Sequence, residues 1–207
     1  MKSSIVDFIL GHLRRLVHTT RFSTVPQTSV ESVAEHSYFV AVYARVLSHY
    51  AMKHGHKVNL QEVLERALLH DAEEVISSDI IYPFKHYGDG GLAAEIDKIN
   101  QTVIHDVFAT LPKELEETFV SIWKRAKKED TIETEIIKVA DILSLLSHSF
   151  EQIHMGNHYF IRISKTAINQ LRKLKIEWYP TLIAELEDHF NDIASTDLSK
   201  NAQITEM

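Results

Sequence analysis

Four side chains that can bind a metal ion lie in three separate stretches that are otherwise rich in Ala, Val, Leu and Ile. They are His36, the adjacent pair His70 and Asp71, and Asp141. Burying a lone carboxylate costs several kcal/mol unless it is paired or bound to a metal, so apolar surroundings make these residues informative. Two imidazoles and two carboxylates suit one divalent ion such as Mn, Co, Fe, Ni or Zn.

Taken singly, each of these residues has a simpler interpretation. A lone His36 at a helix start is more typical of a cap or of a hydrogen-bonded core residue. Asp141 alone could form a buried ion pair with Lys138 or Arg66, and a His-Asp dipeptide such as His70-Asp71 is common. The order His, His-Asp, Asp, with apolar residues around each member, favours a shared metal site over these alternatives.

The pair His70-Asp71 also restricts where such a site can lie. Consecutive residues point about 100° apart on a helix, so both side chains reach one ion only near a helix end or beside a groove. That geometry leaves coordination positions for water and substrate, as a catalytic metal site requires.

The elements that must hold these residues are predicted to be helices of a single all-α domain. Ser32 and Glu35 have the spacing of a capping box, and Thr131 is a plausible cap for another long helix. The domain is expected to span residues 1–194 and to be followed by a polar, frayed tail at 195–207. Helices are expected at about 4–16, 33–53, 59–70, 92–111, 112–123, 132–155, 160–174 and 178–193, with loops at 17–32 and 80–85.

Composition excludes several classes of function. The 207 residues include no cysteine, which rules out disulfides, thiolate metal sites and a cysteine nucleophile, and the net charge of -7 gives no basic footprint for nucleic acid. No apolar stretch is long enough for a membrane span, and no signal peptide is recognisable, so a cytoplasmic protein is expected. The glycines at 88–91 lack the ending of a phosphate-binding loop and favour a turn before a helix.

On these motifs, the chain resembles the HD-domain metal-dependent phosphohydrolases, and within them the YfbR-like 5'-deoxynucleotidases. The resemblance covers about residues 10–175, and four stretches carry it: Arg21-Phe22, Val33-Ala34-Glu35-His36-Ser37, Leu69-His70-Asp71-Ala72-Glu73-Glu74-Val75 followed by Asp79, and Val139-Ala140-Asp141. It implies a helical bundle of the HD-domain type, with His36, His70, Asp71 and Asp141 as metal ligands and Asp71 also as a catalytic residue.

The resemblance also implies roles for residues outside the metal set. Glu74 matches an acidic residue near the attacking water, while neighbouring Glu73 is expected to be solvated. Arg21 matches an arginine that contacts the phosphate, for which a guanidinium is well suited. Phe22 replaces a family tryptophan that packs on the nucleoside; it keeps an apolar face but loses the indole N–H. Asp79 matches a residue near the sugar hydroxyl.

The implied activity is release of phosphate from deoxyribonucleoside 5'-monophosphates. Two alternatives stay open: another HD-type phosphohydrolase acting on nucleoside triphosphates or cyclic dinucleotides, and a metal-binding regulatory module without turnover. The stretches around His36 and His70 lack the extra Lys/Arg cluster that more highly charged substrates would need, and Glu74 with Arg21 argues against a site that only binds. The family commonly forms dimers, so a homodimer is expected, with Tyr82 and Phe84 as exposed apolar candidates for the contact.

Overall fold

The computed structural model describes residues 5–88, 91–128, 130–174 and 176–205, with the backbone alone at 12, 128 and 194–205. This part of the chain is helical without strands, apart from one isolated β-bridge between Thr20 and Ser32. The predicted all-α fold is confirmed. The elements are α1 Ile5–Ile9, the 3-10 helix η1 His12–Val17, α2 Val33–Lys53, α3 Leu60–Leu69, α4 Glu74–Ser77, α5 Tyr82–Lys85, α6 Gly91–Phe108, α7 Lys113–Lys128, α8 Ile132–His154, α9 Tyr159–Leu171 and α10 Leu182–Thr205.

Helices α2, α3 and α8 each begin directly after a residue whose side chain caps them. Ser32 Oγ accepts from the Glu35 backbone N–H at 3.2 Å, and the Glu35 carboxylate accepts from the Ser32 backbone N–H at 2.8 Å. Asn59 caps α3 and Thr131 caps α8, and each side chain accepts a hydrogen bond from one backbone N–H of its helix. Such caps satisfy amide groups that have no partner within the helix, so they fix the starting residue.

Three predicted segments differ in the structure. The expected helix at 4–16 breaks at Gly11, where a Cβ atom would lie 2.5 Å from the Asp7 carbonyl oxygen. The expected loop at 80–85 contains the short helix α5. Trp178 precedes the last helix and does not begin it, because its indole is buried and donates to Glu135 Oε1 at 3.0 Å.

The last helix is also longer than predicted. The backbone of α10 stays helical through Thr205, where the sequence predicted a frayed tail after residue 194. The extent of the domain, 1–194, stays a prediction. Within the described part, each helix is too short or too polar to cross a membrane.

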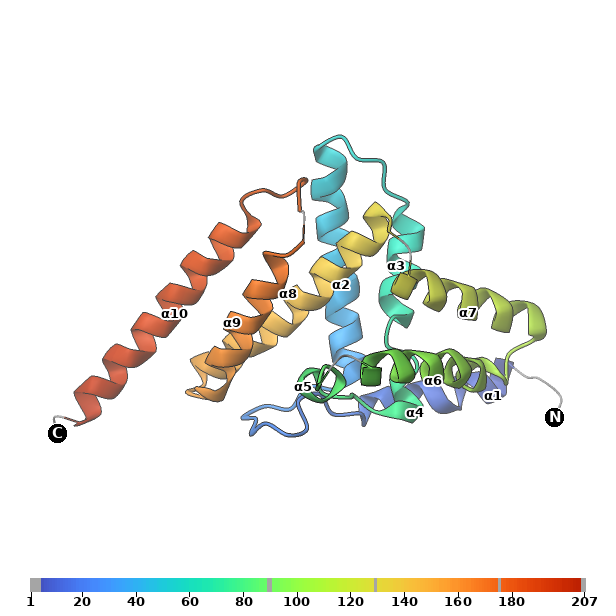
Figure 1. The fold of residues 1–207 in the computed structure, drawn as a ribbon, viewed down its shortest axis with the longest axis horizontal. Coiled ribbons are helices and arrows are strands. Elements are labelled where there is room, and N and C mark those ends of the chain that lie inside the picture. The colour runs from blue at the N-terminus through green and yellow to red at the C-terminus, as the bar shows by residue number, and fades with distance from the viewer. Residues whose placement is uncertain (1–4, 89–90, 129, 175, 206–207) are drawn as a thin grey trace.

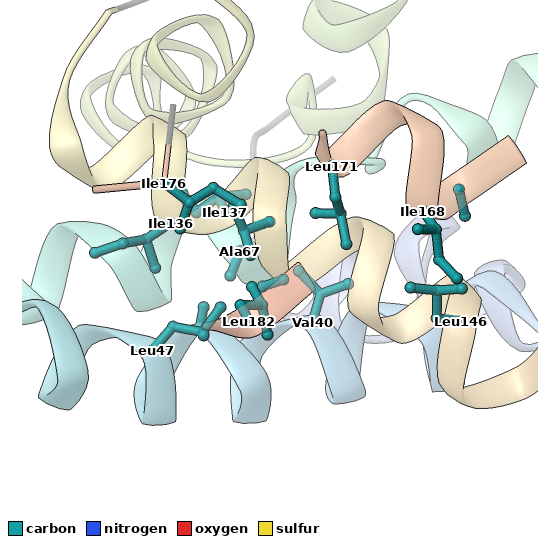
Figure 2. Close-up of a cluster of buried hydrophobic side chains, with 14 of the residues drawn as sticks. Val40, Leu47, Ala67, Ile136, Ile137, Leu146, Ile168, Leu171, Ile176 and Leu182 are labelled. Atoms are coloured by element: carbon teal, nitrogen blue, oxygen red, sulfur yellow. The ribbon is translucent and has the colours of Figure 1, made fainter. Parts of the chain in front are cut away.

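The main core forms where α2 and α8 cross at the centre of the molecule, with α3, α9 and α10 packed around them (Figure 1). Figure 2 shows its buried side chains, which are Val40, Leu47, Ala67, Ile136, Ile137, Leu146, Ile168, Leu171, Ile176 and Leu182 among others. Burial of such side chains is the dominant favourable contribution to folding, so this cluster fixes how α2, α3 and α8 meet.

A second, smaller core covers the end of α3. It is formed mainly by α6 and α7, and it includes Leu69 and Ala72 on either side of His70-Asp71. The chain between α3 and α4 is therefore held between two apolar clusters. This arrangement places His70 and Asp71 at the end of α3, as expected from the angle of about 100° between consecutive residues of a helix.

Candidate metal centre

The four candidate ligands converge from three helices. His36 lies in the first turn of α2, His70 is the C-cap of α3 with Asp71 directly after it, and Asp141 lies in the middle of α8. Asp71 Oδ2 is 3.0 Å from His70 Nε2 and 3.7 Å from His36 Nε2. His36 Nε2 is in turn 3.1 Å from Asp141 Oδ1.

The two imidazoles present unsatisfied nitrogen atoms to this cluster. His36 and His70 are both buried, and neither Nε2 atom makes a hydrogen bond of acceptable geometry within the described part of the chain. Buried nitrogens are normally satisfied, so two of them facing two carboxylates need an explanation. A divalent ion supplies one, and ligand atoms of His36, His70 and Asp71 all lie within 4.8 Å of one another. The donor set fits a metal.

The backbone fixes the orientation of His70. Its Nδ1 lies 2.7 Å from the carbonyl oxygen of Ala67, one turn earlier in α3. Because that carbonyl can only accept, Nδ1 carries a proton, and in the neutral ring Nε2 keeps its lone pair. Metal-binding histidines are commonly held in this way.

The ring of His36 has two competing partners at its other nitrogen. Ser144 Oγ and Arg21 Nη1 each lie 2.9 Å from His36 Nδ1. A guanidinium only donates, whereas a hydroxyl can also accept. Therefore Nε2 is free to bind a metal only in the tautomer whose Nδ1–H donates to Ser144. Burial, followed by the positive charge of Arg21, lowers the pKa of His36 to about 4, which favours the neutral ring.

Asp141 does not form the ion pair that its sequence context alone allowed. Arg66 instead donates to Thr134 at 2.7 Å and pairs with Glu62, and the partner of Asp141 is His36. The side chain of Asp141 is 45% exposed, whereas His36 is fully buried. The cluster is thus closed on the histidine side and open beside Asp141, where water and substrate can enter.

The two adjacent glutamates have different surroundings. Glu74 begins α4, and burial together with the charges of Asp71 and Asp79 raises its pKa to about 10. The prediction that Glu73 is solvated was wrong: it is 3% exposed and accepts from Trp123 Nε1 at 2.6 Å. The reason is that α3 ends at Leu69, and the turn that follows directs Glu73 toward α7.

The loop at 17–32 brings the remaining candidates to the same region. Arg21 donates to Glu31 at 2.7 Å, which holds the guanidinium next to His36. The backbone N–H of Phe22 donates to Asp79 Oδ2 at 3.2 Å, and burial raises the pKa of Asp79 although Arg21 opposes this.

The backbone of Phe22 is strained. Its φ of 54° lies in the left-handed region, which bulky residues rarely adopt. Its ring stacks on His148 with a centroid distance of 5.7 Å and meets Phe160 edge-on at 5.3 Å. The bond to Asp79 and these ring contacts hold the strained residue in place, and such strain is concentrated at functional sites.

Sequence reasoning missed several neighbours of the cluster. Glu31, Ser144, Lys127 and His148 contact candidate residues, and none of them was singled out. Only Ser144 had a usable signal, since it stands three residues after Asp141 and therefore on the same side of α8.

The fold is that of the HD-domain phosphohydrolases. The HD-domain phosphohydrolase of Listeria innocua superposes with a TM-score of 0.74 at 24% identity, covering 94% of this chain and 99% of that one. A cyanophage S-2L HD phosphohydrolase, solved with dA and one catalytic Zn2+ ion, has a TM-score of 0.61 at 16% identity over 93% of this chain and 99% of its own. At these identities the likeness shows the fold alone.

Sequence comparison gives the particular family. The family model described as 5'-deoxynucleotidase YfbR-like matches residues 8–190, so the chain belongs to that family. A 5'-deoxynucleotidase of Photorhabdus laumondii is 36% identical over 166 residues, which are 78% of this chain and 83% of the relative. A 5'-deoxynucleotidase of Erwinia tasmaniensis is 29% identical over 182 residues, or 84% of this chain and 89% of the relative.

Proposed function

We propose that this protein is a metal-dependent 5'-deoxynucleotidase that releases phosphate from deoxyribonucleoside 5'-monophosphates. The relatives named above carry that activity in their names. The main support for this proposal is that ligand atoms of His36, His70 and Asp71 lie close together. The Nε2 atoms of both histidines are buried there without a hydrogen-bond partner among the described residues. Such a set next to an acidic side chain is suited to hydrolysis.

His36, His70, Asp71 and Asp141 would hold the ion, and the donor set suits Mn, Co, Fe, Ni or Zn. A bound divalent ion supplies Lewis-acid polarisation of the phosphate and makes a nearby water more acidic. The partial exposure of Asp141 leaves that side open to the phosphate.

Arg21 would bind the phosphate. When His36 adopts the tautomer that can bind a metal, its Nδ1–H donates to Ser144, and Arg21 loses its acceptor on the ring. The guanidinium, still paired with Glu31, then needs another acceptor, and phosphate oxygens match its geometry. Neutralising phosphate charge in this way lowers the barrier to attack by water.

Glu74 would move the proton. Burial is the largest cause of the raised pKa of Glu74, and the charges of Asp71 and Asp79 add to it. A divalent ion held by Asp71 would offset the part that is due to these charges and so favour a Glu74 carboxylate that can accept a proton. The water oxygen bonds to phosphorus as the bond to the 5'-oxygen breaks. Glu74 would take one proton from the attacking water and later release it to solvent, from which the leaving 5'-oxygen would take up a proton.

Phe22 and Asp79 would contact the sugar. Asp79 is held by the Phe22 backbone N–H through one oxygen, which leaves its other oxygen able to accept from a sugar hydroxyl. Phe22 stands beside it with an apolar ring.

A substrate panel tests the proposed activity. Deoxyribonucleoside and ribonucleoside monophosphates, triphosphates and cyclic dinucleotides are each supplied to the metal-loaded protein, and released phosphate is measured. Fastest release from deoxyribonucleoside monophosphates is expected. Preference for triphosphates or cyclic dinucleotides would instead indicate the other HD-type activity, and metal binding without release from any substrate would indicate a regulatory module.

We further infer a homodimer through the outer face of α2. Five large apolar side chains on this helix are 37% to 62% exposed, and they recur at helical spacing: Tyr38, Phe39, Val42, Val46 and Tyr50. Apolar surface of this kind is typical of an interface. Tyr82 and Phe84, at 53% and 57% exposed, are a second apolar pair.

Light scattering should give the mass of a dimer for the wild type and the mass of a monomer for Val46→Glu. A monomeric wild type would refute the inference. The cytoplasmic location stays a prediction.

A further inference from the structure

Lys127, near the end of α7, reaches into the turn that carries the candidate ligands. Its Nζ lies 3.3 Å from Asp71 Oδ1 and 3.0 Å from Glu73 Oε1. Asp71 therefore uses its two oxygens differently. Oδ2 faces the imidazoles of His36 and His70, while Oδ1 is held by a cation from another helix.

Glu73 connects the same turn to α7 a second time. Its Oε1 accepts from Lys127, and its Oε2 accepts from the indole N–H of Trp123 at 2.6 Å. Trp123 and Lys127 are four residues apart, so they lie on the same face of α7. Trp123 and Glu73 are both buried, which makes this a specific contact and not a loose surface pair.

From these contacts we infer that Lys127 is a positioning residue that fixes Asp71 for metal binding, with Glu73 and Trp123 holding Lys127 in turn. The inference rests on the metal centre of the proposed function. Residues 70–73 form a turn outside the regular helices, so the contact with Lys127 adds to the backbone hydrogen bonds in fixing the Asp71 carboxylate. Partners of metal-binding carboxylates commonly change metal affinity 10–100-fold when removed.

The alternative role for a lysine here is direct contact with the substrate phosphate. Both contacts of Nζ are to carboxylate oxygens of its own chain, those of Asp71 and Glu73. A phosphate would have to compete with two carboxylates for this ammonium group. The geometry thus favours positioning over substrate binding.

Calorimetric titration of the metal-stripped protein with Mn2+, in the absence of nucleotide, tests this inference. Lys127→Met should raise the Mn2+ dissociation constant about 10–100-fold, and Lys127→Arg should restore part of the affinity. Lys113→Met is the matched control, since this exposed lysine of α7 pairs only with Glu116 and Glu117 among the described contacts. It should bind Mn2+ like wild type.

Lys127→Met leaves the buried Glu73 carboxylate without its cation, so the variant could lose stability. The double variant Glu73→Gln/Lys127→Met removes that charge and keeps an acceptor for Trp123. It should show the same loss of Mn2+ affinity, while Glu73→Gln alone should stay within a few-fold of wild type. Unchanged Mn2+ affinity in both Lys127 variants, with a raised KM for nucleotide, would overturn the positioning role. A wild type that binds no divalent ion would refute the metal centre itself.

Discussion

His36 Nε2 on α2 lies 3.1 Å from Asp141 Oδ1 on α8, although the two residues are far apart in the sequence. The contact exists because the apolar faces of α2 and α8 cross in the main core, which sets the distance between the two helices (Figure 1). Packing of the core thus determines the geometry of the candidate metal centre.

Asp71→Ala should remove bound metal and activity together. Asp71 Oδ2 lies within 4 Å of the Nε2 atoms of both His36 and His70, so its loss leaves two imidazole nitrogens and one partly exposed carboxylate. Metal content by atomic absorption should fall below 0.1 ion per chain, and phosphate release by at least about 100-fold. Asp106→Ala, on the exposed side of α6, is the control and should retain both. Full metal content and turnover in the Asp71 variant would contradict the assignment.

Ser144→Ala should weaken metal binding without preventing it. The variant removes the acceptor for His36 Nδ1–H, while Arg21 still favours the tautomer that cannot bind a metal. The expected rise in the metal dissociation constant is about tenfold. Ser147→Ala on the same helix, where the hydroxyl contacts Tyr43, should leave affinity unchanged. Equal affinities in the two variants would show that Ser144 does not orient the ring.

Arg21→Gln should weaken substrate binding more than metal binding. A charge-assisted bond to phosphate is worth about 1.5–3 kcal/mol, so kcat/KM should fall roughly 10–100-fold. The variant is best made with Glu31→Gln, because Glu31 is buried and would lose its cation. Steady-state kinetics with dAMP provide the measurement, with Glu31→Gln alone as the control. A double variant with the kcat/KM of Glu31→Gln alone would exclude Arg21 from phosphate binding.

His148 should make the metal-free protein less stable in acid. Burial, and then the charge of Arg21, lower the pKa of His148 from 6.5 to about 4 in the folded state. The unfolded chain therefore binds more protons between these values, and stability falls as the pH drops through this window. The contribution is about 3 kcal/mol by pH 4, since each pKa unit corresponds to 1.36 kcal/mol.

Urea unfolding of wild type and His148→Gln from pH 7.5 to 4 measures this effect. Other groups with shifted pKa values, such as Glu74 and Asp79, contribute equally to the pH dependence of both proteins. The difference in free energy of unfolding between wild type and variant therefore isolates His148. The stability of wild type relative to the variant should decline on acidification. A difference independent of pH would show that His148 is protonated in the folded state as readily as in the unfolded chain.

The sequence predicted local features of the fold well. The start of α2 depends on Ser32 and Glu35, and the starts of α3 and α8 on Asn59 and Thr131, all of which act on their own backbone neighbours. The four candidate ligands were recognisable because polar residues in apolar helices need a reason. The break at Gly11 could not be recognised from the sequence, because it depends on how closely the backbone at Gly11 approaches the Asp7 carbonyl oxygen.

The supporting contacts of the site could not be predicted in this way. Glu73 was expected in solvent, yet it is buried against Trp123 and Lys127, because the turn after Leu69 rotates it toward a helix about 50 residues later. The positive φ of Phe22 likewise follows from its partners Asp79 and His148 and not from its own sequence preference. Such contacts arise from tertiary packing, which periodicity and capping do not encode.

Titration of the metal-stripped protein with a divalent ion tests the central claim most directly. Phosphate release from dAMP should be absent without added metal, rise linearly with Mn2+ or Co2+, and level off near one ion per chain. One site built from His36, His70, Asp71 and Asp141 predicts this result. Undiminished phosphate release by protein shown to contain no metal would contradict it.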